Sequence, residues 1–331
     1  MAIDVLDEKL HVPGPGRAWQ ESYYFNWSDP AHDVFGLTRI GLRPNEGRAD
    51  ALVLTIRNGR PEFLYPGVGL RLGAFRSLDP SRGIAMGRLR FVMEEPLRRW
   101  RLVLEGRDSM DLVFEACNEP FDYHAVGGDA AEFGSPMAAH HFEQFGRVRG
   151  TTRFHGKTIS IDGFGERDKS WGERDWARIE GWNWLTAQFG PDFAFNVLDV
   201  FDRGRRHLGG FVYRDGANHA VKDYTVDFTW GVREHAPRTA RIRIDDVDGG
   251  HLEVDARADG RFPLYRKRTW IEEAKAEFRT ELGGTARVGH GVLEHVFRPD
   301  LRTTLRQAGD LFPGLARAFR PKQGKEGLLA G

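Results

Sequence analysis

The sequence predicts an all-β protein built from two antiparallel domains. From Val34 onward, apolar and polar residues alternate in short segments that Gly, Pro, Asn-Gly and Asp-Gly separate. This alternation is typical of antiparallel strands joined by tight turns. The chain has 331 residues and is 40% hydrophobic, which is enough for more than one core. Its 23 Phe, 9 Trp and 7 Tyr residues suit strands that enclose an apolar interior.

The first domain is expected over residues 1–160. Leu52, Leu54 and Ile56 alternate up to the turn at Asn58-Gly59. Further strands are expected at Arg88–Met93, Arg99–Leu104, Met110–Ala116, Phe142–Arg149, Thr151–Phe154 and Thr158–Ile161. The Gly- and Ala-rich stretch Phe121–Pro136 is predicted to be a long loop, and residues 163–176 (GFGERDKSWGERDW) break every periodicity.

The second domain is expected over residues 161–331. Its strands are predicted at Trp182–Phe189, Phe193–Phe201, Leu208–Tyr213, Ala220–Trp230, Ala240–Asp245, Leu252–Ala256 and His290–Phe297. Segment Trp270–Leu282 contains good helix formers, but we predict a strand there because a barrel must close and an open edge would invite aggregation. The tail after Arg298 is basic, with at most a short helix at Leu311–Phe319.

Charge and composition exclude several classes of protein. The 48 basic residues equal the 48 acidic ones, so the chain lacks the positive field that binds nucleic acid. Its amino terminus, MAIDVLDEKL, lacks a basic region and an apolar core, which predicts a cytoplasmic location. Apolar runs such as Ala51–Leu54 are far shorter than the roughly 20 residues that cross a bilayer, so no integral membrane association is expected. Cys117 is the only cysteine and is interpreted as a core residue.

Cofactor and metal sites are not expected. The chain has no Gly-x-Gly-x-x-Gly fingerprint between a strand and a helix, no phosphate-binding loop and no Gly-x-Ser-x-Gly elbow. His140 and His141 are adjacent and would lie on opposite faces of a strand, and His290 with His295 has no ligand spacing. Any chemistry must then come from carboxylates, histidines and tyrosines.

Tryptophans and charges concentrate between Arg167 and Trp184. Four of the nine tryptophans, Trp171, Trp176, Trp182 and Trp184, lie within this stretch. Such a cluster can form a cation-binding surface, an apolar pocket wall with a few polar groups, or a packed seam between domains. Composition does not separate the pocket from the seam.

This cluster resembles a known signature. The run Gly163, Arg167-Asp168, Ser170-Trp171-Gly172, Arg174-Asp175-Trp176 is similar to the segment that opens the second domain of the carotenoid hydratase (hydroxyneurosporene synthase) and related lipocalin-like families. Its Ser-Trp-Gly-x-Arg-Asp-Trp form is most similar to uncharacterised members of the same two-domain build. Agreement extends to Glu21–Phe25, His141–Gly150, Trp182-x-Trp184 with Gln188, and Gly289-x-Gly291 before Glu294. Those hydratases carry histidine where this chain has Lys169, so a role of that histidine does not transfer.

The resemblance implies two lipocalin-like barrels or half-barrels that hydrate, isomerise or cyclise isoprenoid-like molecules without a cofactor. Gly163-x-Gly165 precedes Asp168 at the same offset as Gly289-x-Gly291 precedes Glu294, which suggests one acid in each domain. We therefore expect Asp168 and Glu294 to be catalytic. The residues expected to bind substrate are Trp171, Trp176, Trp182, Trp184, Gln188, His141 and His290.

Three functions remain open from the sequence. An enzyme would act on an alkene, enone or similar apolar substrate, with a carboxyl group whose pKa is raised among tryptophans, unless Arg167 or Arg174 pairs with Asp168 and keeps it ionised. A carrier would hold a hydrophobic ligand in the second barrel without chemistry. A scaffold would have no sizeable cavity. A carboxyl group or histidine inside the main cavity favours the enzyme, and a wholly apolar lining favours the carrier.

Overall fold

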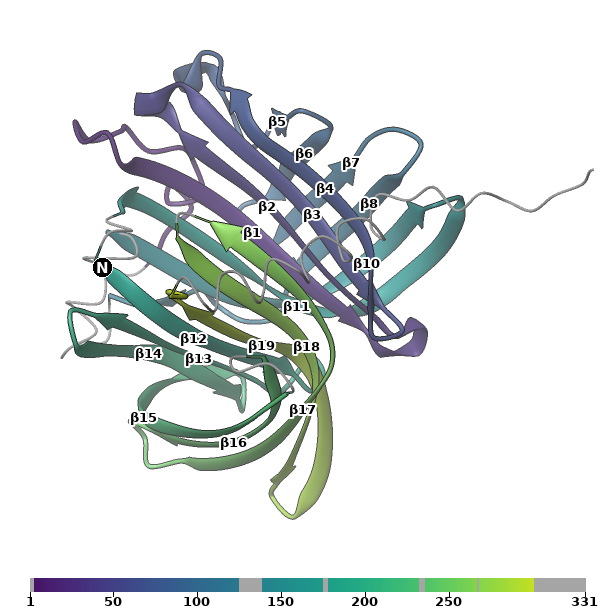
Figure 1. Cartoon of the computed structure of the whole chain (residues 1–331), viewed down its shortest axis with the longest axis vertical. Helices are drawn as coiled ribbons and strands as arrows, with labels where there is room; N and C mark the ends of the chain where they lie inside the picture. Colours follow the sequence, from purple (N-terminus) through teal and green to yellow (C-terminus); the bar gives the residue numbers. More distant parts are fainter. Residues whose placement is uncertain (1–2, 125–138, 175–177, 232–235, 267, 301–331) are drawn as a thin grey trace, which may run out of the picture.

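The computed structural model describes residues 3–124, 139–174, 178–231, 236–266 and 268–300, and strands make up most of it. The prediction of an all-β protein with two domains is confirmed. Figure 1 shows an open, curved sheet from the first half of the chain above a closed barrel from the second half. Within the described residues the only helical segments are three 3-10 turns, η1 (Pro30–His32), η2 (Pro44–Glu46) and η3 (Phe75–Ser77).

The first sheet has the strand order β4-β3-β2-β1-β11-β10-β8-β7-β6-β5, and β9 pairs with β10. Its strands are β1 (Trp19–Asp29), β2 (Val34–Arg43), β3 (Arg48–Arg57), β4 (Arg60–Arg71), β5 (Ile84–Met86), β6 (Leu89–Glu95), β7 (Arg99–Leu104), β8 (Ser109–Ala116), β9 (Phe121–Asp122), β10 (His140–Phe154) and β11 (Lys157–Glu173). Strand β8 buries alternate residues, as a strand with one solvent face should. Strand β1 is buried on both faces, because Tyr23 and Phe25 pack in the sheet's own core whereas Ser22 and Tyr24 face the barrel.

The barrel closes in chain order from β12 to β19. Its strands are β12 (Ile179–Gln188), β13 (Ala194–Asp202), β14 (Arg205–Arg214), β15 (Ala217–Trp230), β16 (Pro237–Asp246), β17 (His251–Arg266), β18 (Thr269–Leu282) and β19 (Thr285–Phe297). The predicted strand at Trp270–Leu282 is confirmed as β18. The closure of the barrel therefore outweighs the helix-forming residues of this segment. Apolar side chains such as Leu185, Phe195 and Phe278 fill the barrel interior.

Strand β11 corrects two expectations. It runs to Glu173, so the prediction that residues 163–176 break the strand pattern was wrong over the described part. Polar residues on both faces hide the alternation there, since Asp168 lines the space next to the barrel while Arg167 is buried on the opposite face. A domain boundary at residue 160 falls inside β11. The chain instead passes from sheet to barrel between Glu173 and Ile179.

Other expected segments need smaller corrections. The two strands expected on either side of Gly150 form the single strand β10, in which Gly150 has a φ of 144°. The expected loop Phe121–Pro136 begins with the short strand β9, and its residues from 125 onward lie outside the described residues. The expected helix at Leu311–Phe319 and the basic tail beyond residue 300 also lie outside them. No helix in the described part of the chain is long and apolar enough to cross a bilayer.

The two domains share an apolar core between them. Side chains of the first sheet, such as Phe35 and Leu54, cluster with Leu198 and Phe262 of the barrel. A buried lysine of β18, Lys275, adds an ionic contact, because its Nζ lies 2.5 Å from Oδ1 of Asp33 in the first domain. These contacts fix the barrel against β1–β4 and so define the space that the site occupies.

A substitution at Gly165 tests whether β11 lies as close to β1 as the structure shows. A Cβ atom at this position would lie 1.9 Å from the backbone oxygen of Asn26, which cannot move without breaking the strand ladder. We expect Gly165→Ala to lower the free energy of unfolding by about 1–3 kcal/mol, the usual cost of overpacking. The control is Gly73→Ala, since a Cβ there would have no neighbour within 4 Å. Equal urea denaturation midpoints for the two variants would contradict this account of β11.

Candidate functional site

A cavity of about 450 Å³ lies between the open sheet and the barrel. Its walls come from β1–β4, β10 and β11 on one side and from β12, β13 and β17–β19 on the other. The apolar residues of the wall are Leu37, Leu52, Leu64, Pro66, Leu198, Phe262, Leu264 and Ile271. Val68 and Tyr265 also line it and are 77% and 49% exposed, so the cavity opens to solvent between β4 and β17. The main cavity is therefore between the domains rather than inside the second barrel, where a carrier was expected to hold its ligand.

Polar side chains reach the cavity in two cross-strand rows, one from each domain. In the first sheet, Tyr24 on β1 pairs with Asp168 on β11, which pairs with Glu143 on β10. Directly paired residues of neighbouring strands project from the same face. All three residues line the cavity.

The barrel contributes the equivalent row. Trp184 on β12 pairs with Glu294 on β19, which pairs with Glu273 on β18. In each domain the row thus crosses three strands, which in chain order are the first strand, the last strand and the strand before the last. The two acids that follow matching glycine spacings, Asp168 and Glu294, occupy the middle of their rows. Two similar strand arrangements therefore present an aromatic residue and two carboxyl groups to one cavity.

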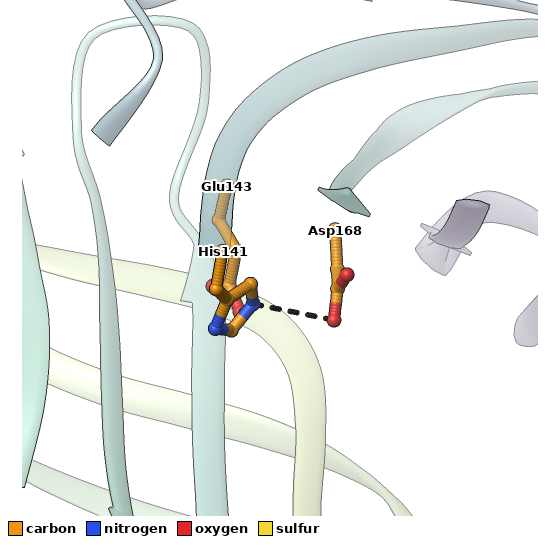
Figure 2. Close-up of side chains that lie close together, drawn as sticks. All are labelled: His141, Glu143 and Asp168. Atoms are coloured by element: carbon orange, nitrogen blue, oxygen red, sulfur yellow. Dashed lines mark ion pairs between the residues drawn. The ribbon is translucent and has the colours of Figure 1, made fainter. Parts of the chain in front are cut away.

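A histidine fixes the charge of the first row. His141 Nε2 lies 3.3 Å from Oδ2 of Asp168 and 2.9 Å from Oε1 of Glu143 (Figure 2). Burial alone would lower the pKa of His141, but the two carboxylates raise it to about 10. Its ring stacks on Tyr123 with centroids 4.5 Å apart, which holds the imidazole in place. His141 is therefore an imidazolium ion at neutral pH.

Asp168 is ionised as a result. Burial would raise the pKa of its carboxyl group, but the charge of His141 and a smaller contribution from Arg174 lower it below the ordinary range. Arg167, the other expected partner, lies elsewhere and donates hydrogen bonds to Glu8. The pKa of Asp168 is thus lowered, as considered for a pairing with Arg174, and not raised, as considered for an apolar wall; the larger contribution comes from His141.

The second row behaves in the opposite way. Glu273 and Glu294 are 3% and 8% exposed. Burial raises the pKa of Glu273 well above its ordinary value, and the neighbouring charge of Glu294 raises it further. Burial also raises the pKa of Glu294, although hydrogen bonds from Glu273 and from the indole of Trp182 oppose the shift. This pair retains at least one proton at neutral pH.

Glu143 forms a second acid pair with Glu166, which does not line the cavity. Glu166 is fully buried, and its pKa is raised well above the ordinary value by burial and by Glu143. The side-chain amide of Asn196 donates hydrogen bonds to both glutamates, and the Tyr123 hydroxyl donates to Glu143 Oε2 at 3.0 Å. These contacts fix Glu143 and hence the imidazolium ion.

The structure brings together some of the expected site residues and leaves others apart. Asp168, Glu294, Trp182, Trp184 and His141 line the cavity. Trp171 does not, because it projects from the opposite face of β11 and stacks between His11 and His140. Trp176 lies outside the described residues.

Gln188 and His290 also lie away from the cavity. They pair with each other across β12 and β19, four residues beyond Trp184 and Glu294, which is roughly 13 Å along a strand. The amide of Gln188 donates to Thr186 Oγ1 at 3.2 Å. The two residues therefore extend the polar face of these strands but take no part in the cavity.

Tyr24, Glu143 and Glu273, which complete the two rows, escaped the sequence analysis. Each lies on a different strand, and only the register of the sheets places it beside Asp168 or Glu294. The sequence contained one signal: Glu143 follows His141 by two residues, and residues two apart in a strand lie on the same face.

His141, Glu143 and Asp168 also offer a nitrogen and two carboxylate oxygens within 4.8 Å of one another. Such a donor set suits a divalent metal such as zinc, although no metal site was expected from the histidines. The distances from Nε2 to both carboxylates are those of proton-bridged ion pairs, and we interpret the group in that way. Metal analysis of the purified protein decides between the two.

Comparisons with known proteins agree with the fold. Residues 4–298 match the model of a family described as a domain of unknown function (DUF7064). No curated protein sequence matches the chain. The crystal structure of kievitone hydratase from Nectria haematococca is similar, with a TM-score of 0.61, 13% identity and coverage of 89% of this chain and 93% of that one. The structure of CghA is similar too, with a TM-score of 0.62, 12% identity and coverage of 88% and 94%. CghA with Sch210972 gives a TM-score of 0.61, 12% identity and coverage of 87% and 93%.

Proposed function

Because residues 4–298 match its model, the chain belongs to the DUF7064 family, and from its site we propose an activity for this member. We propose that it is a cofactor-independent enzyme that performs acid/base chemistry on a hydrophobic, isoprenoid-like small molecule. The reaction is a hydration or dehydration, an isomerisation or a cyclisation. The observation that carries the proposal is the pair of facing rows in one cavity, one with an ionised carboxylate and the other with a carboxyl pair that retains a proton.

The two rows supply the acid and the base of such a reaction. In a hydration, the Glu273–Glu294 pair donates a proton to one carbon of the alkene. Asp168 accepts a proton from the water molecule that adds to the neighbouring carbon. The site then resets when the pair regains a proton and Asp168 releases one. Groups with opposite pKa shifts in one pocket are the usual means by which a site performs both transfers near neutral pH.

The fold of the relatives supports the proposal by analogy only. Kievitone hydratase is a hydratase by its name and shares the two-domain architecture. A carrier would need none of the acid/base groups His141, Glu143, Asp168, Glu273 and Glu294, which line this cavity together with the charged residues Arg39, Asp50 and Arg174. Burying such groups costs free energy, so a cavity that only stores an apolar ligand is expected to lack them.

The proposal is tested by incubating the protein with an apolar metabolite extract and analysing the products by mass spectrometry. The native protein should convert one component into an isomer or into a product that differs by one water molecule. Glu294→Gln should bind the same component and convert it far more slowly. A ligand that is bound and released unchanged by the native protein would identify a carrier.

The acid pair also predicts a pH dependence. Both carboxyl pKa values are raised, so turnover should stay high into the neutral range and decline as pH rises through the last ionisation of the pair. In Glu273→Gln the remaining carboxyl group has no charged partner, its pKa is lower, and the decline should move to lower pH. Glu277→Gln, on the same strand but outside the cavity, is the control and should leave the profile unchanged. Identical pH–rate profiles for all three proteins would exclude the pair as the acid.

A further inference from the structure

Two hydrogen-bond donors in the cavity have no acceptor among the described residues. They are the hydroxyl group of Tyr24 and the indole N–H of Trp184, and both atoms are shielded from solvent. Trp184 is only 6% exposed, and its ring meets that of Tyr24 edge to face with centroids 5.4 Å apart. The two donors thus come from equivalent strands, β1 and β12, and the rings that carry them are in contact at the wall of the cavity.

Leaving such donors without an acceptor is costly. A buried polar group that makes no hydrogen bond lowers the stability of the protein by about 1–3 kcal/mol. A phenylalanine at either position would avoid the cost, so the polar atoms are expected to bind something. Burial raises the pKa of the Tyr24 hydroxyl well above its ordinary value, so the group keeps its proton and can donate it.

We infer that Tyr24 and Trp184 form a binding site for a carbonyl oxygen, and that the substrate is a ketone or enone with an apolar body. This inference rests on the proposed function and names its substrate class. A carbonyl oxygen has two lone pairs and no proton, which matches two donors. An ammonium group has no lone pair and would leave both donors without an acceptor.

The position of the two donors gives the reaction a defined course. Asp168, the neighbour of Tyr24 in its row, takes a proton from water while the water oxygen bonds to the β-carbon of the enone. The electron pair of the C=C bond moves to the carbonyl oxygen, where the donors stabilise the enolate. Glu294, the neighbour of Trp184, then gives a proton to the α-carbon as the carbonyl re-forms. One water molecule is added, and the site transfers one proton in each direction.

The test uses β-ionone, labelled with a heavy isotope at its carbonyl carbon, and the hydrocarbon of the same skeleton. Binding is measured by calorimetry, and the carbonyl resonance is followed by NMR. We expect the enone to bind more tightly than the hydrocarbon and its carbonyl carbon to shift downfield on binding. Tyr24→Phe and Trp184→Phe should each weaken enone binding about 3- to 10-fold, the value of one neutral hydrogen bond, and reduce the shift. Neither should affect the hydrocarbon.

The matched controls are Tyr65→Phe and Trp230→Phe, which make the same substitutions outside the cavity. Both should bind the enone like the native protein. Equal binding of the enone and the hydrocarbon would contradict the inferred carbonyl-binding site. So would a carbonyl shift that persists in both Tyr24→Phe and Trp184→Phe. Neither result would contradict ligand binding in the apolar cavity. If neither compound binds, the proposed function itself is contradicted. Tyr24→Phe and Trp184→Phe each test the inference alone. If one of them misfolds, the other still gives the result.

Discussion

Replacing Asp168 by asparagine is expected to lower turnover about 100-fold or more, the lower end of what general acid/base catalysis contributes. Asparagine keeps the size of the side chain and can still contact His141, but it cannot accept a proton. The ion pair with His141 keeps Asp168 ionised, so in the proposed reaction the residue is the base and not the acid that its tryptophan-rich surroundings suggested. Turnover is measured on the compound that the native protein converts, and binding is measured separately.

The control for this variant is Asp162→Asn on the same strand. Asp162 is 56% exposed and pairs with Arg147 outside the cavity, so its substitution should leave turnover unchanged. Normal turnover by a folded Asp168→Asn protein would remove Asp168 from the chemistry. Failure of that variant to fold would favour a structural role at the junction between the domains.

Replacing Glu8 by alanine is expected to destabilise the protein by about 3–5 kcal/mol, because it leaves a buried charge without its partner. Glu8 is fully buried and accepts hydrogen bonds from the Arg167 guanidinium at 2.7 and 3.1 Å. It also accepts the backbone N–H of Leu97 at 2.7 Å. The segment before β1 is thus tied to the face of β11 opposite Asp168. Denaturant unfolding followed by circular dichroism measures the effect.

Two further variants make this result specific. Asp7→Ala removes the neighbouring carboxylate, whose side chain is 28% exposed, and should change stability by less than about 1 kcal/mol. The double variant Glu8→Ala/Arg167→Met removes both charges and should recover much of the loss. If Glu8→Ala were as mild as Asp7→Ala, the buried ion pair would contribute little to stability.

The alternation of apolar residues was sufficient to predict most strands, and barrel closure correctly outweighed helix propensity in β18. The prediction was wrong for β11, because this strand has polar groups on both faces and the alternation of hydrophobicity disappears. Asp168 faces the cavity there, whereas Arg167 forms its ion pair on the opposite face of the sheet. A strand whose two faces both carry buried ionic contacts has no signature in a hydrophobic pattern.

The site was predictable only in part. Asp168 and Glu294 could be found because the family resemblance includes both positions and matching glycine spacings precede them, and the structure explains those glycines by the close approach of neighbouring strands at Gly165 and Gly291. Glu273 and Tyr24 could not be found, since cross-strand register depends on the whole barrel. Trp171 shows the opposite error: it lies three positions after Asp168, and in a strand that odd offset puts the two on opposite faces.

The most direct measurement of the central claim is proton transfer to carbon in heavy water. An apolar extract, or the compound identified from it, is incubated in D₂O with the native protein and with the double variant Glu273→Gln/Glu294→Gln, and the products are analysed by mass spectrometry. The account predicts a product that carries deuterium on carbon with the native protein and no such product with the double variant. A ligand recovered without deuterium from the native protein, or equal labelling by both proteins, would contradict it.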